Sequence, residues 1–369
     1  MKIDNAENLY YIGGVVRDEI LGKESFDIDL TYVGNAIEFV QNLDGIKILK
    51  INKPFGTVRV QIDNNEADIA STRAEIYEHA GHLPTVTKIG CELREDVIRR
   101  DFTINAMAKN YQSGEIVDYT GGLEDIKNKK LRVLHNKSFV EDPTRILRAL
   151  KFAVRFNFSL EENTKKLRDE YLRNINYDMS YKRVKKELIE TFNLNSQKAY
   201  DEFINAKIYK LITKNDVKKP SINIENLINK YKPLFNPDNI WLIYVGTIYD
   251  IKNLESTLTK NEKKIIDDFL NIQHNKPKND YDIYKLFENV HIETILLYAI
   301  RTNIEIARHY LDNLRNIKIS ITGKELQNLG YSPSKKYGEC FEYILKEKIK
   351  NNNMTLDDEI KLANSFFKQ

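Results

Sequence analysis

The sequence predicts an α+β protein, with a strand-rich first region followed by a long all-helical region. Apolar and β-branched segments of strand length are concentrated in about the first 138 residues. Beyond them, amphipathic patterns with a helical period dominate and are interrupted by prolines and glycines. A chain of 369 residues with 41% hydrophobic residues can bury the cores of two or three domains.

The overall composition predicts a cytoplasmic protein that does not enter a membrane. The longest apolar stretches, 240–245 and 294–300, are far shorter than a membrane span. Cys91 and Cys340 stand apart from any metal-ligand or redox spacing. The net charge of only +3 means that any basic surface for a nucleic acid must be local.

The first strand leads into a glycine turn. The apolar run 9–12 is followed by Gly13 and Gly14, and then by a helix-compatible segment that ends at Gly22. Glycines allow the backbone to approach an anion, and Arg17 adds a bidentate donor one turn later. The pattern indicates either a phosphate site or an ordinary turn.

The next strand, 26–32, carries two acidic residues. Alternation places Asp27 and Asp29 on one face, where their mutual repulsion calls for a cation such as Mg²⁺. The alternative is a solvated acidic face on an edge strand. The short distance in sequence between this pair and the glycine turn favours a common site for metal and phosphate.

A hairpin is expected next, from strand patterns at 46–51 and 57–62, followed by a strand that carries Asp68. If that strand lies beside the acidic pair, Asp68 can supply a third oxygen to the metal. Hydrogen bonding to the neighbouring Thr72 or Arg73 is an equally good interpretation.

Residues 77–84 contain histidine, glycine and proline, and this composition predicts a mobile loop. His79 and His82 invite a metal assignment, but two histidines without further ligands are more often surface residues. We therefore assign no metal to this loop.

The segment 99–108, RRDFTINAMA, has two interpretations. The apolar and small residues after Asp101 fit a helix for which Asp101 is the N-cap. The donors and acceptors of Arg100 and Asn105 also suit a triphosphate and a ribose. Further on, Gly121 and Gly122 form a second glycine pair, which indicates a structural turn or, alternatively, a hinge.

A capped helix begins near 141, and Asp142, Arg145 and Arg148 recur on one of its faces. Intrahelical ion pairs explain this spacing. A chemical explanation also fits: an acceptor-only aspartate beside a donor-only arginine matches the edges of cytosine and adenine and mismatches uracil and guanine. The protein would then select C and A without a nucleic-acid template.

Later basic residues are candidates for RNA contacts. The amphipathic helix 180–188 has a basic side that includes Arg183. Lys335, Lys336 and Tyr337 are suited to an RNA backbone. A solvated, charged helix exterior explains both sets equally well.

The motifs together resemble the class II (bacterial-type) tRNA nucleotidyltransferases, the family of CCA-adding enzymes and bacterial poly(A) polymerases. The resemblance covers about residues 9–190, where five motifs occur in the correct order. They are GGVVRD at 13–18, DID at 27–29, RRDFTINAMA at 99–108, DYTGGLED at 118–125 and EDPTRILRALKF at 141–152.

The resemblance implies a polymerase-β-like head on a small mixed sheet at 1–138, a helical neck at 139–195, a body at 196–275 and a tail at 276–369. It implies a two-metal Mg²⁺ site with Asp27 and Asp29 as the catalytic residues. One position departs from the family pattern, because Lys151 stands where many members have an arginine, and an ammonium lacks the planar fork. The nucleotide-binding residues so implied are Gly13, Gly14, Arg17, Arg100, Asn105, Asp142, Arg145, Arg148 and Lys151.

The expected activity is the addition of CCA to the 3′ end of tRNA from CTP and ATP, with release of pyrophosphate. The tRNA acceptor arm is the expected partner, and neither DNA nor a membrane is expected. Addition of A or of CC alone, or poly(A) synthesis, is the main alternative. A non-catalytic RNA-binding protein is a further alternative, against which the intact acidic pair argues.

Overall fold

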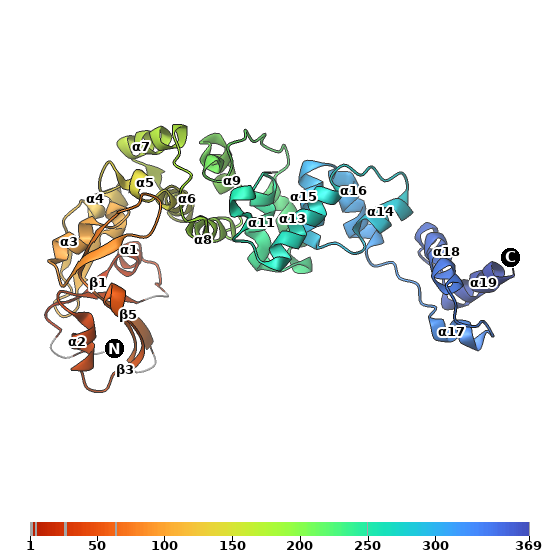
Figure 1. Ribbon diagram of the computed structural model, residues 1–369, viewed down its shortest axis with the longest axis horizontal. Helices are drawn as coiled ribbons and strands as arrows, with labels where there is room; N and C mark the ends of the chain where they lie inside the picture. Colours follow the sequence, from red (N-terminus) through yellow and green to blue (C-terminus); the bar gives the residue numbers. More distant parts are fainter. Residues whose placement is uncertain (1–2, 4–5, 26–27, 63–64, 249, 369) are drawn as a thin grey trace. The chain divides into compact units, whose positions relative to one another are not determined.

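The computed structural model describes residues 3, 6–25, 28–62, 65–248 and 250–368 (Figure 1). The chain forms two compact units. The first contains residues 1–217 and 252–257, and the second contains residues 218–251 and 258–369. The predicted division into head, neck, body and tail stays a prediction.

The first unit is built on a seven-stranded mixed sheet with the order β3-β4-β5-β2-β1-β8-β9. Only the β2–β5 pair is parallel among the pairs in this sheet. The strands are β1 (Leu9–Ile12), β2 (Asp29–Tyr32), β3 (Lys47–Asn52), β4 (Thr57–Ile62), β5 (Asn65–Ser71), β8 (Met107–Asn110) and β9 (Ile116–Asp118).

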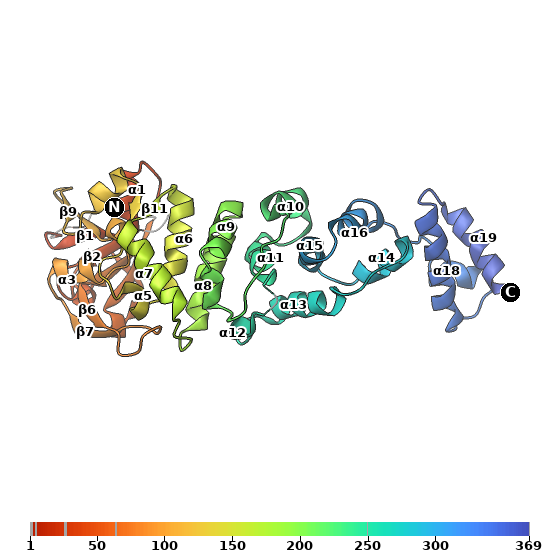
Figure 2. The ribbon, with the colours of Figure 1, turned by 90° about the horizontal axis from the view of Figure 1, so that it is seen from above.

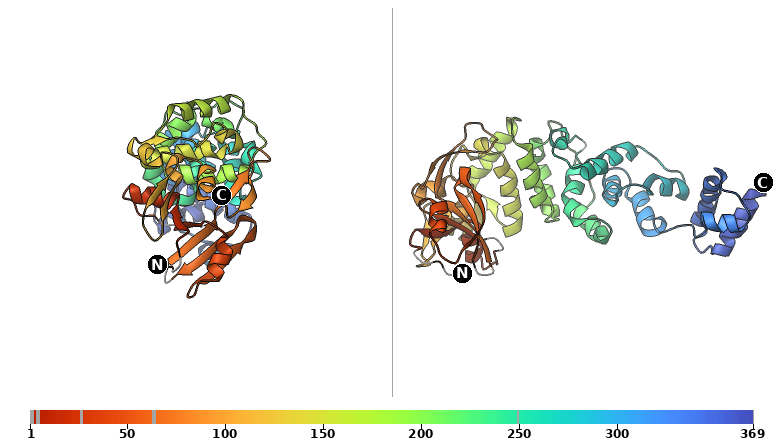
Figure 3. Two further views of the ribbon diagram at one scale, coloured as in Figure 1. Left: turned by 90° about the vertical axis from the view of Figure 1, so that its left-hand side faces the viewer. Right: turned by 60° about the horizontal axis from the view of Figure 1, so that its bottom comes forward.

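The two faces of this sheet differ in polarity. Leu30, Val58 and Ile69 are buried in one core, against which the helix α2 (Ala36–Gln41) packs. The sheet and α2 are drawn in red and orange in Figure 3. Because neighbouring residues of a strand point to opposite faces, Asp29 and Asp68 lie on the other face, which is polar there and carries a second core at Ile12, Leu93 and Val97.

The first region also holds a short hairpin and four short helices. The hairpin is formed by β6 (Arg73–Ile76) and β7 (Thr85–Ile89), which pair antiparallel. The helices are α1 (Gly14–Ile20), α3 (Leu93–Ile98), α4 (Gly122–Lys127) and α5 (Ser138–Glu141).

The helix expected after Asp101 is not formed. A single 3₁₀ turn at Thr103–Asn105 leads directly into β8, whose Met107 and Ala108 are fully buried between β1 and β9. Small and apolar residues suit a buried strand as well as a buried helix, so the pairing with β1 and β9 decides the structure.

The remainder of the first unit is largely helical and confirms the α+β prediction. Figure 2 shows α6, α8 and α9 as neighbours, and all three are in contact. A two-stranded parallel sheet joins the head to this region. These elements are β10 (Lys130–Leu131), β11 (Ser159–Leu160), α6 (Thr144–Phe156), α7 (Glu162–Arg173), α8 (Tyr181–Phe192), α9 (Gln197–Asn205) and α12 (Lys252–Glu255).

The second unit is helical throughout its described part, and none of the described helices has the length and apolar character that crossing a bilayer requires. Its largest fully buried side chain is Trp241. The helices are α10 (Ile224–Tyr231), α11 (Ile240–Gly246), α13 (Lys260–Ile272), α14 (Asp280–Phe287), α15 (Ile292–Arg301), α16 (Ile304–His309), α17 (Gly323–Asn328), α18 (Lys336–Lys350) and α19 (Leu356–Phe367).

Candidate nucleotide-binding site

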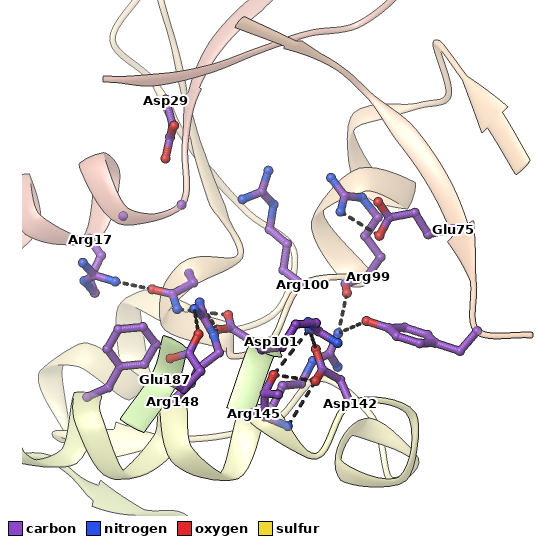
Figure 4. A pocket seen from close by; sticks show the side chains of 17 residues that line it. Arg17, Asp29, Glu75, Arg99, Arg100, Asp101, Asp142, Arg145, Arg148 and Glu187 are labelled. Atoms are coloured by element: carbon purple, nitrogen blue, oxygen red, sulfur yellow. Dashed lines mark hydrogen bonds and ion pairs between the residues drawn. The ribbon is translucent and has the colours of Figure 1, made fainter. Parts of the chain in front are cut away.

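One pocket of about 410 Å³ in the first unit brings together most of the predicted nucleotide-binding residues. Figure 4 shows Asp29 and Arg17 on one side, Asp142 and Arg145 on the other, and Arg100 between them. The lining residues are Gly13, Gly14, Arg17, Asp29, Glu75, Tyr77, Arg99, Arg100, Asp101, Asn105, Asp142, Thr144, Arg145, Arg148, Phe152, Arg183 and Glu187.

The glycine turn between β1 and α1 combines a left-handed backbone at Gly13 with a close approach of Arg100. Gly13 has φ of +73°, and a Cβ there would lie 2.9 Å from Nη1 of Arg100. The turn is anchored to the sheet because the N–H of Gly13 donates to the carbonyl of Met107. Glycine at this position therefore lets the Arg100 guanidinium approach the backbone where the pocket begins.

Arg17 is buried and held from three sides. Its guanidinium donates to Asp18 at 2.8 Å and to the side-chain oxygen of Asn105, and it lies 4.5 Å from the ring centre of Phe156. Burial lowers the pKa of Arg17, although the carboxylate of Asp18 acts in the opposite direction. A cation buried this deeply is well placed to gain from an anionic ligand.

Arg100 has hydrogen-bonding capacity to spare. Its Nη2 donates to Asp96 at 3.1 Å, whereas its Nε is buried without a partner in the described part of the chain. Asp96 also accepts from Arg99 at 2.7 Å. An unpaired donor on a guanidinium that lines a pocket fits an oxygen-rich ligand such as a triphosphate.

Asp101 connects the phosphate side of the pocket with the helix α6. It accepts from Asn105 at 3.0 Å and from Nε of Arg148 at 2.7 Å. Arg148 also donates to Glu187 of α8 at 3.3 Å. Lys151 is buried and paired with Glu187 at 2.8 Å, and it is not among the residues that line the pocket. Lys151 therefore pairs with α8 outside the pocket lining, and a contact between Lys151 and a nucleotide stays a prediction.

Asp142 precedes α6, and protein donors hold both of its oxygens. One oxygen accepts from the backbone of Thr144 at 3.1 Å and from its hydroxyl at 2.5 Å. The other forms a short ion pair with Arg183 of α8. A carboxylate accepts about four hydrogen bonds, so this arrangement fixes its orientation and leaves capacity for a base amino group.

Arg145 is fixed in the same pocket by neutral partners. It donates to the hydroxyl of Ser138 at 2.7 Å and to the backbone carbonyl of Arg99 at 3.0 Å. Its guanidinium lies 5.9 Å from the ring centre of Tyr77. Asp142 and Arg145 thus present a carboxylate and a guanidinium side by side, which is the arrangement that the C and A hypothesis needs.

The acidic strand lies at the glycine end of this pocket. Asp27 lies outside the described residues. Asp29 lines the pocket and is directly opposite Asp68 of the parallel strand β5, so the two carboxylates lie on the same sheet face. An all-oxygen set of this kind suits Mg²⁺. No group of three or more potential ligands occurs among the residues that the structure describes.

Asp68 has a different partner from those considered in the sequence. Neither Thr72 nor Arg73 binds it, because Thr72 donates to the Cys91 carbonyl and Arg73 donates to other groups. Arg59 of β4 forms two hydrogen bonds with its carboxylate, at 2.9 and 2.6 Å. A cation therefore already lies at the oxygens that a metal would use.

The loop 77–84 is docked rather than free. The N–H of Gly81 donates to the carbonyl of Glu141 at 2.9 Å, and His82 bonds to Asp178 at 3.0 Å. A Cβ on Gly81 would lie 2.8 Å from the carbonyl oxygen of Asp178, so glycine is required for this close approach. These contacts hold Gly81 and His82 against Glu141 and Asp178, and the mobility of the loop stays a prediction.

Sequence reasoning missed seven residues of the pocket and misplaced an eighth. The residues that line it without having been predicted as site residues are Glu75, Tyr77, Arg99, Asp101, Thr144, Phe152 and Glu187. Arg183 was expected to contact RNA from the outer side of its helix, but it faces Asp142. The four-residue spacing of Arg183 and Glu187, which puts them on one face of α8, is the signal that could have identified both.

The remaining predicted RNA-binding residues lie in the second unit. Lys335 and Lys336 are exposed at the start of α18. Tyr337 instead packs into the local core, where its hydroxyl donates to the Tyr331 carbonyl at 2.7 Å. An RNA-binding role stays a prediction for the two lysines, and for Tyr337 the packing is the simpler explanation.

Comparisons with known proteins agree with this fold. A family model described as the poly A polymerase head domain matches residues 9–132. The A-adding tRNA nucleotidyltransferase of Halalkalibacterium halodurans is 28% identical over 98% of this chain and 89% of that protein. The A-adding tRNA nucleotidyltransferase of Aquifex aeolicus is 33% identical over 92% of this chain. This chain spans only 44% of the length of the Aquifex protein.

A solved structure of a CCA-adding enzyme without ligand superimposes with a TM-score of 0.80, at 28% identity, over 97% of this chain and 91% of the other. The mixed sheet, the glycine turn and the helical remainder define a chain with a nucleotidyltransferase-type head. The matches above support the class II tRNA nucleotidyltransferase family that the motifs predicted.

Proposed function

We propose that this protein adds CCA to the 3′ end of tRNA from CTP and ATP without a nucleic-acid template. The observation that carries the proposal is the single pocket that joins the glycine turn, Asp29 and two arginines to the Asp142–Arg145 pair. Such a pocket can bind a triphosphate at one end and a base at the other. A cytoplasmic location fits this activity.

The chain's own residues would act mainly by positioning and by charge stabilisation. Arg17 and Arg100 would bind the triphosphate, and Asp142 and Arg145 would orient a base that offers an amino donor beside a ring-nitrogen acceptor. Asp27 and Asp29, with Asp68, would hold divalent ions. Bound there, such ions would lower the pKa of the RNA 3′-hydroxyl and neutralise charge on the triphosphate.

Addition of A alone is the second candidate. Three relatives whose matches cover more than nine tenths of this chain carry the name A-adding tRNA nucleotidyltransferase. Cytosine and adenine offer the same donor and acceptor order, so the Asp142–Arg145 pair suits either product.

The test is extension of three tRNA transcripts, ending at the discriminator base, at C or at CC, with each nucleoside triphosphate alone and with CTP plus ATP. We expect CTP to extend the first two and ATP to extend the third, giving CCA with the mixture. Extension of only the CC-ended transcript would contradict CCA addition and support A addition. Failure to extend any transcript would contradict the proposed activity.

A further inference from the structure

The polar face of the sheet carries a row of charges that runs away from the acidic strand. Lys50, Arg59, Asp68 and Asp29 are directly opposite one another across β3, β4, β5 and β2. Directly paired residues share a sheet face, so two cations continue the line of two carboxylates. The helix α2 packs against the opposite face of these strands.

The position of Arg59 is not explained by protection of the sheet edge. Lysines on an edge strand such as β3 discourage pairing with other chains, which accounts for Lys50. Arg59 lies on β4, which is paired on both sides. Its side chain is 52% exposed and that of Asp68 is 45% exposed, so the pair contributes little to folding stability and can be exchanged.

The contact of Arg59 competes with a metal for the same atoms. Its Nε and Nη2 bind the two carboxylate oxygens of Asp68, at 2.9 and 2.6 Å. A divalent ion that used these oxygens would displace and repel the guanidinium. A guanidinium released there suits a phosphate as well as it suits a carboxylate, because both accept its planar fork.

We propose that Arg59 is an exchangeable counterion and positioning residue. It holds Asp68 in the metal-free protein, and after a divalent ion binds, it contacts the backbone phosphate at the RNA 3′ end, with Lys50 extending that surface. The proposal rests on the proposed function, because it assumes that the RNA end and the divalent ions meet at Asp29 and Asp68.

The first test measures Mn²⁺ binding by electron paramagnetic resonance on the full chain, at fixed ionic strength and without RNA or nucleotide. Removing the competitor in Arg59→Gln should tighten Mn²⁺ binding about two- to fivefold, the range expected for an exposed ion pair. Lys50→Gln removes the same charge one strand away and should leave Mn²⁺ affinity nearly unchanged. Asp68→Asn should weaken it.

The second test measures affinity for a tRNA transcript in the presence of Mg²⁺, by filter binding and without turnover. Arg59→Gln should bind this RNA several-fold more weakly and with a shallower salt dependence. Arg59→Lys keeps the charge but not the fork, so it should bind RNA nearly as well as the unmodified chain while still binding Mn²⁺ more tightly.

The opposite directions of the two effects distinguish exchange from a structural role. Weaker or unchanged Mn²⁺ binding in Arg59→Gln would overturn the proposal, as would equal tightening in Lys50→Gln, which would indicate a general charge effect. Neither assay requires nucleotide addition. A chain that extends no tRNA but shows both shifts would disprove the proposed function and support the exchange.

Discussion

At the residue scale, each described charged side chain around the pocket is fixed by a specific partner before any ligand binds. Arg17 is held by Asp18 and by a ring, and Arg145 by a hydroxyl and a backbone carbonyl. Because these donors are already held in place, they need to rearrange little when a nucleotide binds. The pocket is therefore organised for binding by its own hydrogen bonds, and Asp101 takes part by accepting from Asn105 and Arg148.

Asp101 should make the stability of the first unit sensitive to acid. Burial alone would raise the pKa of Asp101, but Arg148 and Asn105 outweigh it and lower the pKa to about 2. When the pKa of a carboxyl group is lower in the folded chain than in the unfolded chain, the group stabilises the folded state. That contribution is complete only at pH values above the unfolded pKa of about 3.9. That stabilisation, about 2 kcal/mol, is lost as the pH falls from about 4 toward 2.

We expect Asp101→Asn to lower the free energy of unfolding by about 2 kcal/mol or more at pH 7, and by much less near pH 2.5. Urea unfolding followed by circular dichroism at both pH values measures this difference. Exposed Asp44 provides the control, and Asp44→Asn should change stability little at either pH. If the difference in free energy of unfolding between Asp101→Asn and the unmodified chain were the same at both pH values, the lowered pKa of Asp101 would be contradicted.

At the element scale, the second glycine turn shows how an element near the pocket is locked in place. One oxygen of Asp118 accepts three consecutive backbone N–H groups, and the other accepts the N–H of Leu123. Burial acts to raise the pKa of Asp118, but these four donors lower it. The turn leads into α4, whose Asp125 bonds to Thr103 at 2.7 Å. These contacts fit the structural-turn interpretation.

The two glycines of this turn should respond differently to alanine. A Cβ on Gly122 would lie 2.4 Å from the backbone carbonyl of Thr103, whereas one on Gly121 would meet nothing within 4 Å. Gly122→Ala should therefore cost about 2–3 kcal/mol of stability through overpacking. Gly121→Ala should cost about 1 kcal/mol, from its left-handed backbone alone.

Thermal unfolding of both variants, followed by circular dichroism, measures this difference. Equal melting temperatures for the two variants would contradict the overpacking against Thr103 that we predict for Gly122→Ala.

At the scale of the whole molecule, the net charge is small, but some parts of the surface carry neighbouring basic residues. The chain has 57 basic and 54 acidic residues, yet Lys335 and Lys336 lie exposed at the start of α18 in the second unit. Lys348, on the same helix, is instead buried against Glu359. Of these three lysines, Lys335 and Lys336 are available to a polyanion and Lys348 is not.

Replacing Lys335 and Lys336 with glutamine should weaken tRNA binding and reduce the slope of log affinity against log salt by roughly one to two. The affinity for ATP should not change, because these lysines are not among the pocket residues. The matched control replaces two exposed lysines of α13 in the same unit, Lys260 and Lys264. An equal loss of tRNA affinity in the control would contradict a specific role for α18.

The sequence alone determined the α+β class, the family and most residues of the pocket. Local patterns carried this information, because the glycine turn before α1 and the acidic alternation in β2 are read from neighbouring residues. The helix α6, with Asp142 at its entry, followed from capping and spacing.

The tertiary structure decided what long-range pairing controls. Met107 and Ala108 became a strand because β1 and β9 flank them, although their local pattern also fits a helix. Strand register paired Asp68 with Arg59 of the neighbouring strand, and helix packing paired Asp142 with Arg183, which is distant in sequence. Lys151 turned toward Glu187 for the same reason. A side chain's partner depends on strand register and helix packing, which arise only when the whole unit folds.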